Sequence, residues 1–298
     1  MRILVTGGGG FIGAWIVQAL AKAGHRPVVF DVHANRDKVA EIAGADLADK
    51  LDWITGDIVS TEDVTRAAAD CGSIIHLAGL LTPACRQNPV LGANVNLIGT
   101  LNIFLAARAH GIGNVAYMSS MGVFGPDGGP EPHPTTLYGA FKLGGEYSAR
   151  AFLDDAGITS TGFRPYVVYG PGRETGASAG PTLACRAAAR GADYTIPFSG
   201  HIDMIHAQDV ARIFLSAVQT PPPGANTVNL LGVSGETTEI ARTIETLAPG
   251  ALISVSGAPM PIKAPASEPK LAELFPDWRS MSLEQGLRDT IAHYRNHD

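Results

Sequence analysis

The chain has 298 residues, a net charge of −6 and a hydrophobic fraction of 45%. That length suits one large α/β domain with a smaller attached part, and that hydrophobic fraction is sufficient to build a buried core. The acidic balance and the lack of a long basic run argue against a nucleic-acid partner.

Neither a membrane span nor a secreted form is expected. Gly or polar residues interrupt each apolar stretch before it is long enough to cross a bilayer. The N-terminus enters a strand at once, without the pattern of a signal peptide. Cys71, Cys85 and Cys185 are scattered, and their spacing matches neither a disulfide framework nor a metal site. We therefore expect a cytoplasmic protein without a metal.

Over the first 170 residues, short β-branched runs alternate with longer amphipathic runs. They predict strands at 2–6, 26–31, 51–55, 73–77, 114–119 and 159–164, and helices at 11–23, 38–47, 61–69, 89–110 and 135–156. This alternation is typical of βαβ units, and right-handed crossovers place helices on both faces of the sheet. The fold class is therefore α/β, with a doubly wound parallel sheet of the Rossmann type.

The regularity weakens after Pro171. We expect helices at 183–189, 208–217, 237–247 and 283–293, and a strand at 227–231. Residues 1–170 are interpreted as the Rossmann core. Residues 171–298 are interpreted as mainly a small, partly interleaved α/β cap that binds substrate, with segments near 201–231 returning to the core.

A glycine-rich turn follows the first predicted strand. Gly7, Gly10 and Gly13 have the spacing that permits a tight turn, close approach to a pyrophosphate and helix–strand packing. Alone, the turn is equally compatible with a flexible loop. Asp31 ends the second strand, where an acid can bond the adenosine ribose and repel a 2′-phosphate, although a helix N-cap or turn role is the alternative. The pattern favours NAD, and nearby Arg36 leaves NADP open.

A phenol and an amine lie four residues apart in a predicted helix. Tyr138 and Lys142 then share one helical face, and the cation is expected to lower the pKa of the phenol so that it can act as a general base. An ordinary surface pair is the alternative for this spacing alone. Ser119 and Ser120 end the preceding strand, at the edge where such sheets bind ligands. Ser120 is expected to bond the substrate oxygen, and simple turn chemistry explains the other serine.

Together these motifs resemble the extended short-chain dehydrogenases/reductases, also called the NAD-dependent epimerase/dehydratase family. The resemblance covers nearly the whole chain, and its motifs are Thr6–Gly13, Gly56–Ile58, His76–Gly79, Asn96–Thr100, Ser120, Tyr138, Lys142, Arg164-Pro165, Tyr169–Gly172, Asp203–Ala211 and Ser282–Leu287. It implies catalysis by Ser120, Tyr138 and Lys142. The cofactor residues that it implies, together with those of the turn, are Gly7, Gly10, Phe11, Ile12, Gly13, Asp31, Asp57, Ile58, Leu77, Ala78, Gly79, Asn96, Tyr138, Lys142 and Pro165.

Two positions depart from the family pattern. Many relatives that act on nucleotide sugars carry Asn where this chain has Val167, and Arg where it has Ile202. Aliphatic side chains cannot bond a diphosphate. We therefore expect a substrate smaller than a nucleotide sugar, in a fairly apolar pocket formed by 79–81 and Val167.

Two arginines and two helices complete the interpretation. Arg173 follows the glycine turn at 170–172 and is a candidate for a substrate carboxylate, with a surface or cofactor-side position as the alternative. Arg86, after the fourth strand, is a second candidate. The helices at 89–110 and near 139–152 are the elements through which members of this family often dimerise, so the resemblance implies a homodimer.

The leading hypothesis is an NAD-dependent oxidoreductase that removes hydride from a secondary alcohol of a small sugar or sugar acid. The first alternative is an NAD-dependent sugar epimerase, which would use the same three residues and retain its cofactor. A non-catalytic NAD-binding sensor is the alternative from another class, since one fold hosts many functions.

Overall fold

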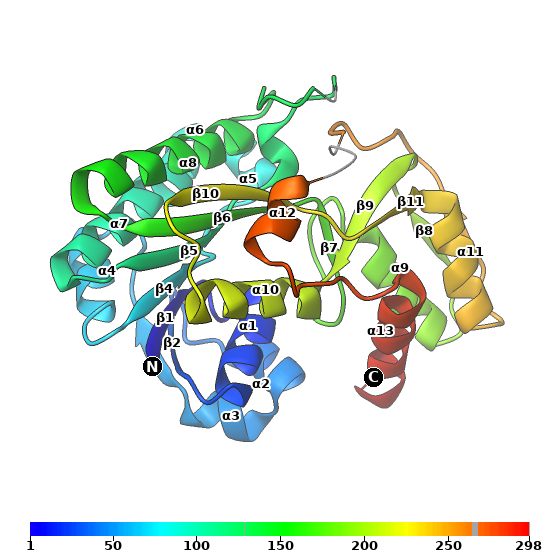
Figure 1. The fold of residues 1–298 in the computed structure, drawn as a ribbon. Coiled ribbons are helices and arrows are strands. Elements are labelled where there is room, and N and C mark those ends of the chain that lie inside the picture. Colours follow the sequence, from blue (N-terminus) through cyan, green and yellow to red (C-terminus); the bar gives the residue numbers. More distant parts are fainter. Residues whose placement is uncertain (128, 264–267, 298) are drawn as a thin grey trace.

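The computed structural model describes residues 1–127, 129–263 and 268–297. Its larger sheet has seven parallel strands in the order β10-β6-β5-β4-β1-β2-β3, which confirms the predicted doubly wound fold (Figure 1). The strands are β1 (Arg2–Thr6), β2 (Arg26–Asp31), β3 (Asp52–Thr55), β4 (Ser73–His76), β5 (Asn114–Met118), β6 (Thr159–Pro165) and β10 (Ala225–Leu230).

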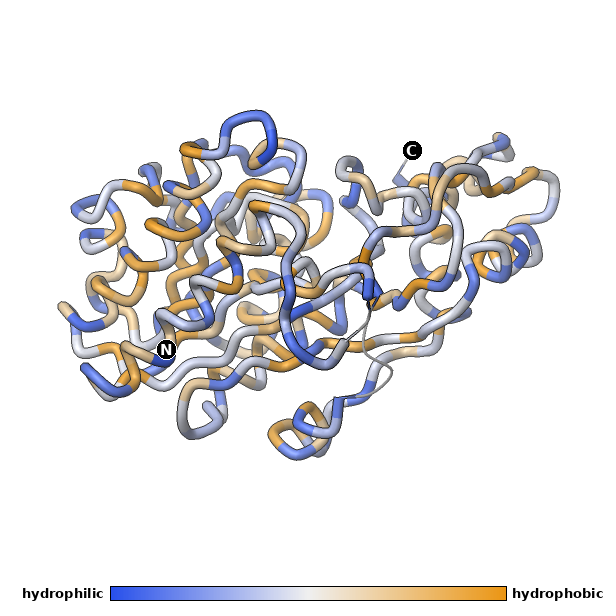
Figure 2. Tube along the Cα trace, turned by 90° about the horizontal axis from the view of Figure 1, so that it is seen from above, coloured by the Kyte–Doolittle hydropathy of each residue, from blue (hydrophilic) through white to orange (hydrophobic). Residues whose placement is uncertain are grey.

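Helices cover both faces of this sheet because successive side chains of a strand point to opposite sides. Ile3 and Val5 pack in one apolar cluster, and Leu4 packs in another. The first cluster includes residues of α1 (Phe11–Lys22), α2 (Asp37–Ala43), α3 (Ala45–Lys50) and α10 (Ala207–Gln219). The second includes residues of α4 (Thr61–Ala67), α7 (Gly99–His110) and α8 (Leu137–Ala156). Seen from above, hydrophobic residues concentrate inside this larger body (Figure 2).

The predicted helix at 89–110 is interrupted. It consists of α6 (Pro89–Ala93), a π-helical turn η1 (Asn94–Ile98) and α7, and it follows the short helix α5 (Thr82–Gln87). By length and composition this run could cross a membrane, so the expectation that no stretch is long enough was wrong. Half of its most apolar window is buried within the protein, as in a core helix.

The smaller body lies beyond the carboxyl ends of the parallel strands (Figure 1). It contains a three-stranded sheet of β7 (Val167–Tyr169), β9 (His201–His206) and β11 (Val233–Glu236), and a pair of β8 (Tyr194–Ile196) with β12 (Ile253–Val255). Its helices are α9 (Gly180–Ala189), α11 (Thr237–Leu247) and α13 (Leu283–His297). The helix α12 (Pro269–Leu274) returns to the core cluster. The four shorter strands, β7, β8, β11 and β12, had no clear sequence pattern, because three or four residues are too few to display one.

The chain crosses between the two bodies more than once. β9 pairs with β7 and β11 in the smaller body, whereas α10 directly after it packs on α1, and β10 pairs with β6 in the large sheet. The two bodies are therefore interleaved, and the cleft between them receives side chains from distant parts of the sequence.

Candidate active site

The turn between β1 and α1 has the geometry of a phosphate cradle. Gly7 has a positive φ of 67°, and a Cβ there would lie 2.8 Å from the Ala78 nitrogen. A Cβ on Gly13 would collide with the carbonyl oxygen of Gly7, so the helix could not pack this closely on the turn. No side chain caps the N-terminus of α1, which leaves its first N–H groups available to an anion.

Asp31 lies at the end of β2, next to this turn. Its carboxylate accepts hydrogen bonds from the Gly9 nitrogen at 3.2 Å and the Val32 nitrogen at 2.9 Å. These bonds fix the carboxylate beside the glycine turn, where a ribose hydroxyl of a dinucleotide would lie. The open glycine turn and this fixed acid fit NAD.

Two adjoining cavities of about 330 and 360 Å³ follow the turn, and they share Gly7, Gly10 and Leu77. The structure places most of the predicted cofactor residues on their walls: Gly7, Gly10, Phe11, Ile12, Gly13, Asp31, Asp57, Ile58, Leu77, Ala78 and Gly79. Of the remaining ones, Tyr138, Lys142 and Pro165 line the next cavity, whereas Asn96 lines none of the three.

A third cavity of about 250 Å³ contains the predicted catalytic residues Ser120, Tyr138 and Lys142. It shares Ile12, Leu77, Leu81, Met118 and Arg173 with the second cavity, so the three cavities form one continuous cleft. The nitrogen of Lys142 donates a hydrogen bond to the Met118 carbonyl oxygen at 2.8 Å. This bond ties α8 to the carboxyl end of β5, directly before the two serines.

Burial controls the titration of the catalytic pair. Burial raises the pKa of the Tyr138 phenol. The hydrogen bond with Ser120 and the charge of Arg173 lower this pKa, but burial is the larger effect. The expectation that Lys142 sets the pKa of the phenol was therefore wrong for this geometry. Burial also lowers the pKa of Lys142 to about 8, while Cys85 and Glu146 raise it.

The start of α8 is seated on the turn after Ser120. Thr136 caps the helix by accepting a hydrogen bond from the Gly139 nitrogen at 3.1 Å. A Cβ on Gly139 would collide with the Gly122 carbonyl oxygen. Glycine at this position therefore lets Tyr138 approach Ser120, a contact that the Tyr-x-x-x-Lys spacing alone does not reveal.

Asn96 supports the cleft from behind. It lies in the π-helical turn η1, is 1% exposed, and donates a hydrogen bond to the Leu80 carbonyl oxygen at 3.1 Å. Its side-chain oxygen accepts from the Leu80 nitrogen at 3.1 Å, and a Cβ on Gly79 would meet that oxygen at 2.6 Å. Asn96 therefore holds the backbone at 79–80. Its place in a π-helical turn agrees with this role, because such turns are frequent at functional sites.

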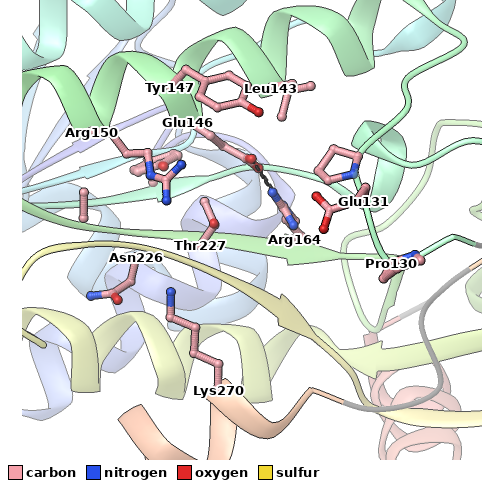
Figure 3. A pocket seen from close by; sticks show the side chains of 13 residues that line it. Pro130, Glu131, Leu143, Glu146, Tyr147, Arg150, Arg164, Asn226, Thr227 and Lys270 are labelled. Atoms are coloured by element: carbon pink, nitrogen blue, oxygen red, sulfur yellow. Dashed lines mark hydrogen bonds and ion pairs between the residues drawn. The ribbon is translucent and has the colours of Figure 1, made fainter.

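A buried ion pair lies behind the catalytic residues, and sequence reasoning missed it (Figure 3). Arg164 donates to both carboxylate oxygens of Glu146, with Nε at 2.7 Å from Oε1, and the Ser119 hydroxyl donates to Oε1 at 2.5 Å. The signal available in the sequence was the position of Glu146, one helical turn after Lys142 in the same predicted helix. The pair joins α8, β5 and β6 below the cleft, on the wall of a separate polar cavity of about 240 Å³.

Two predictions about the substrate pocket, those for Arg86 and Val167, need correction. Arg86 lies on α5 rather than in a loop, is exposed, and lines none of the cavities of the cleft. Val167 and Ile202 are buried in the apolar cluster of the smaller body, because alternate residues of a strand face opposite sides. Residues 79–81 do line the pocket as predicted, whereas the neighbours of Val167, namely Tyr166 and Val168, line it in place of Val167. Arg173 does line the pocket.

Fold and cleft together define a dinucleotide-binding enzyme of the extended short-chain dehydrogenase/reductase type. Residues 3–230 match the NAD-dependent epimerase/dehydratase family, and the chain belongs to that family. Its cofactor is NAD.

The relatives of known activity include sugar epimerases. The chain is 28% identical to a UDP-glucose 4-epimerase of Mycolicibacterium smegmatis, with 99% of each chain covered. It is 29% identical to a 2-alkyl-3-oxoalkanoate reductase of Stenotrophomonas maltophilia, covering 76% of this chain and 67% of that one. The crystal structure of a Thermus thermophilus UDP-glucose 4-epimerase in complex with NAD superposes with a TM-score of 0.84 at 25% identity, covering 100% of both chains.

Proposed function

We propose that this protein is an NAD-dependent sugar epimerase, which inverts a carbon that bears a hydroxyl group. The observation that carries the proposal is the similarity to UDP-glucose 4-epimerases along the whole chain, combined with a cleft that continues from the glycine turn to Ser120, Tyr138 and Lys142. The epimerase alternative therefore replaces the dehydrogenase as the leading hypothesis.

The chemistry follows from the groups in the third cavity. NAD, when bound, supplies the hydride acceptor and donor. Tyr138 takes the proton of the substrate hydroxyl and returns it, and Ser120 hydrogen-bonds the same oxygen. Lys142, fixed by Met118, has its nitrogen 5.8 Å from the centre of the Tyr138 ring, where it would hold the ribose of the cofactor next to the tyrosine.

One observation favours a dehydrogenase as the second candidate. Val167 and Ile202 offer no group to a nucleotide diphosphate, and both are buried away from the cleft. A substrate without a nucleotide gains less binding energy from remote contacts, and release of an oxidised product then competes with return of the hydride.

One assay separates the two candidates. Purified protein with NAD is given UDP-glucose, UDP-galactose and the corresponding free sugars, and both NADH absorbance and the epimeric product are followed. The proposal expects inverted sugar without net NADH, whereas accumulation of NADH with ketone would establish the dehydrogenase. Tyr138→Phe should lower kcat by about 10²–10⁴-fold and leave NAD binding within about twofold. Turnover that survives this substitution would contradict the catalytic assignment.

We also propose that two copies associate through the helices at 89–110 and α8. Exposed apolar side chains gather there: Val90, Leu91, Ile98, Leu137 and Tyr147. Covering such a face stabilises an assembly. Sedimentation should give twice the chain mass, and Tyr147→Glu should give the single mass; a wild-type monomer would contradict this.

The free, buried cysteines Cys71, Cys85 and Cys185 support a cytoplasmic location.

A further inference from the structure

Arg173 lines the cleft, and one of its hydrogen-bond donors is unused among the described residues. Its Nη2 donates to the Ser178 hydroxyl at 3.1 Å, but its Nε is buried and has no partner among the residues that the structure describes. A buried donor without an acceptor is unfavourable, and so is a half-buried guanidinium without an anion. An anion from outside the chain would therefore complete the arrangement.

The acid nearest in sequence does not meet this need. Glu174 lines the second cavity beside Arg173, but its carboxylate bonds Lys38 at 2.9 Å and lies 3.7 Å from Arg186. Among the described residues no carboxylate forms an ion pair with Arg173, and burial lowers the pKa of the guanidinium. Its charge is therefore left for a ligand.

The segment that carries Arg173 is anchored at several points. Trp15 donates a hydrogen bond to the Pro171 carbonyl oxygen at 3.1 Å, and the Gly172 nitrogen donates to the Tyr294 hydroxyl at 3.2 Å. The guanidinium lies 5.6 Å from the centre of the Phe11 ring. A side chain held in this way loses little conformational freedom on binding, which favours recognition of a ligand.

Arg173 also has a defined position relative to the reaction. It lines the third cavity together with Ser120 and Tyr138, and its charge acts on the tyrosine. It lines the second cavity as well, beside Phe11 and Gly10. An anion on Arg173 therefore lies between the reacting hydroxyl and the glycine turn.

We propose that Arg173 binds the carboxylate of the substrate, and that the substrate is a sugar acid whose carboxylate lies close to the reacting hydroxyl. This inference rests on the proposed function, since it concerns the same site. A planar guanidinium matches a carboxylate through two parallel hydrogen bonds. The cofactor pyrophosphate is the other source of anionic oxygens in this cleft, and the test separates the two.

The experiment compares wild type, Arg173→Met, Arg173→Lys and the control Arg295→Met, which alters an exposed arginine of α13. Each is assayed with NAD on matched acid and neutral pairs: glucuronate with glucose, and UDP-glucuronate with UDP-glucose. Calorimetry measures binding of NAD to each protein, and binding of glucuronate and of UDP-glucuronate to each protein with NAD present.

For one pair or both, wild type should prefer the acid. Arg173→Met should lower kcat/KM and binding of that acid by about 100-fold, because two charge-assisted hydrogen bonds are lost, and should leave NAD binding within about twofold. Arg173→Lys should recover part of the loss, and Arg295→Met should match wild type.

Three results would overturn the inference: equal use of acid and neutral sugars, no binding of either acid, or an equal loss of NAD and acid binding in Arg173→Met. The last would assign Arg173 to the pyrophosphate. Binding of an acid that depends on Arg173, without turnover of any sugar, would instead contradict the proposed function and leave this assignment standing.

Discussion

The two halves of the cleft are built in different ways. The cofactor half is formed by residues 7–13, 31–32, 56–58 and 77–80, which follow successive strand ends, and much of its wall is backbone exposed by glycine. The substrate half gathers side chains from β5, α8, the loop at 173–178 and residues near 260. A backbone wall suits a constant ligand, whereas a wall of distant side chains lets specificity change without altering the fold.

The largest expected effect is below the substrate half, at the buried ion pair that ties α8 to β6. Glu146→Gln leaves Arg164 buried without its anion, so the free energy of unfolding should fall by about 3–5 kcal/mol in a denaturant titration. Glu284→Gln, which breaks an exposed pair on α13, should cost less than about 1 kcal/mol. Equal losses in the two variants would show that the buried pair has no special role.

The same variant should change the pH dependence of turnover. Burial lowers the pKa of Lys142 to about 8, against Cys85 and Glu146, which raise it. Burial also lowers the pKa of His76, and the charge of Lys142 lowers it further. Without the negative charge of Glu146, the pKa of Lys142 falls further, and the ammonium is lost at lower pH. The alkaline limb of the pH–rate profile should therefore move to lower pH, and an unchanged limb would contradict this coupling.

A smaller effect is expected from adding one methyl group to the cofactor half. Gly13→Ala places a Cβ against the Gly7 carbonyl oxygen, so α1 must move away from the turn. NAD affinity measured by calorimetry should fall by about 100-fold, because the cradle depends on this packing. Gly113→Ala, where a Cβ has open space, is the matched control. Unchanged affinity in Gly13→Ala would mean that the backbone does not form the cradle.

The smallest effect concerns Asp31, the acid that we propose selects NAD over NADP. Asp31→Asn removes the charge that repels a 2′-phosphate. It keeps one side-chain oxygen, so it retains one of the two hydrogen bonds from the Gly9 and Val32 nitrogens, which reach different oxygens of the carboxylate. The ratio of NADP to NAD affinity should rise by about tenfold, or about 1.4 kcal/mol. A constant ratio would show that selectivity comes from another part of the cofactor half.

Much of the cofactor half was predictable, because each of its motifs is short and directly follows a strand. Glycine spacing and Asp31 are local patterns, as is the pair Tyr138 and Lys142 in the substrate half, and parallel topology brings strand ends to one edge. The substrate half was less predictable. Arg86 and Arg173 both follow strand ends, yet Arg86 is exposed on α5 and only Arg173 lines the cleft.

By itself the sequence determined the parallel sheet, the glycine turn and the nature of the cofactor, since hydrophobic alternation and backbone sterics act over a few residues. Only the tertiary structure decided that Val167 is buried, that Glu146 pairs with Arg164, and that the Nε of Arg173 has no partner within the described part of the chain. Such facts depend on which distant segments meet, and on the solvent that their contact excludes. Local patterns do not contain that information.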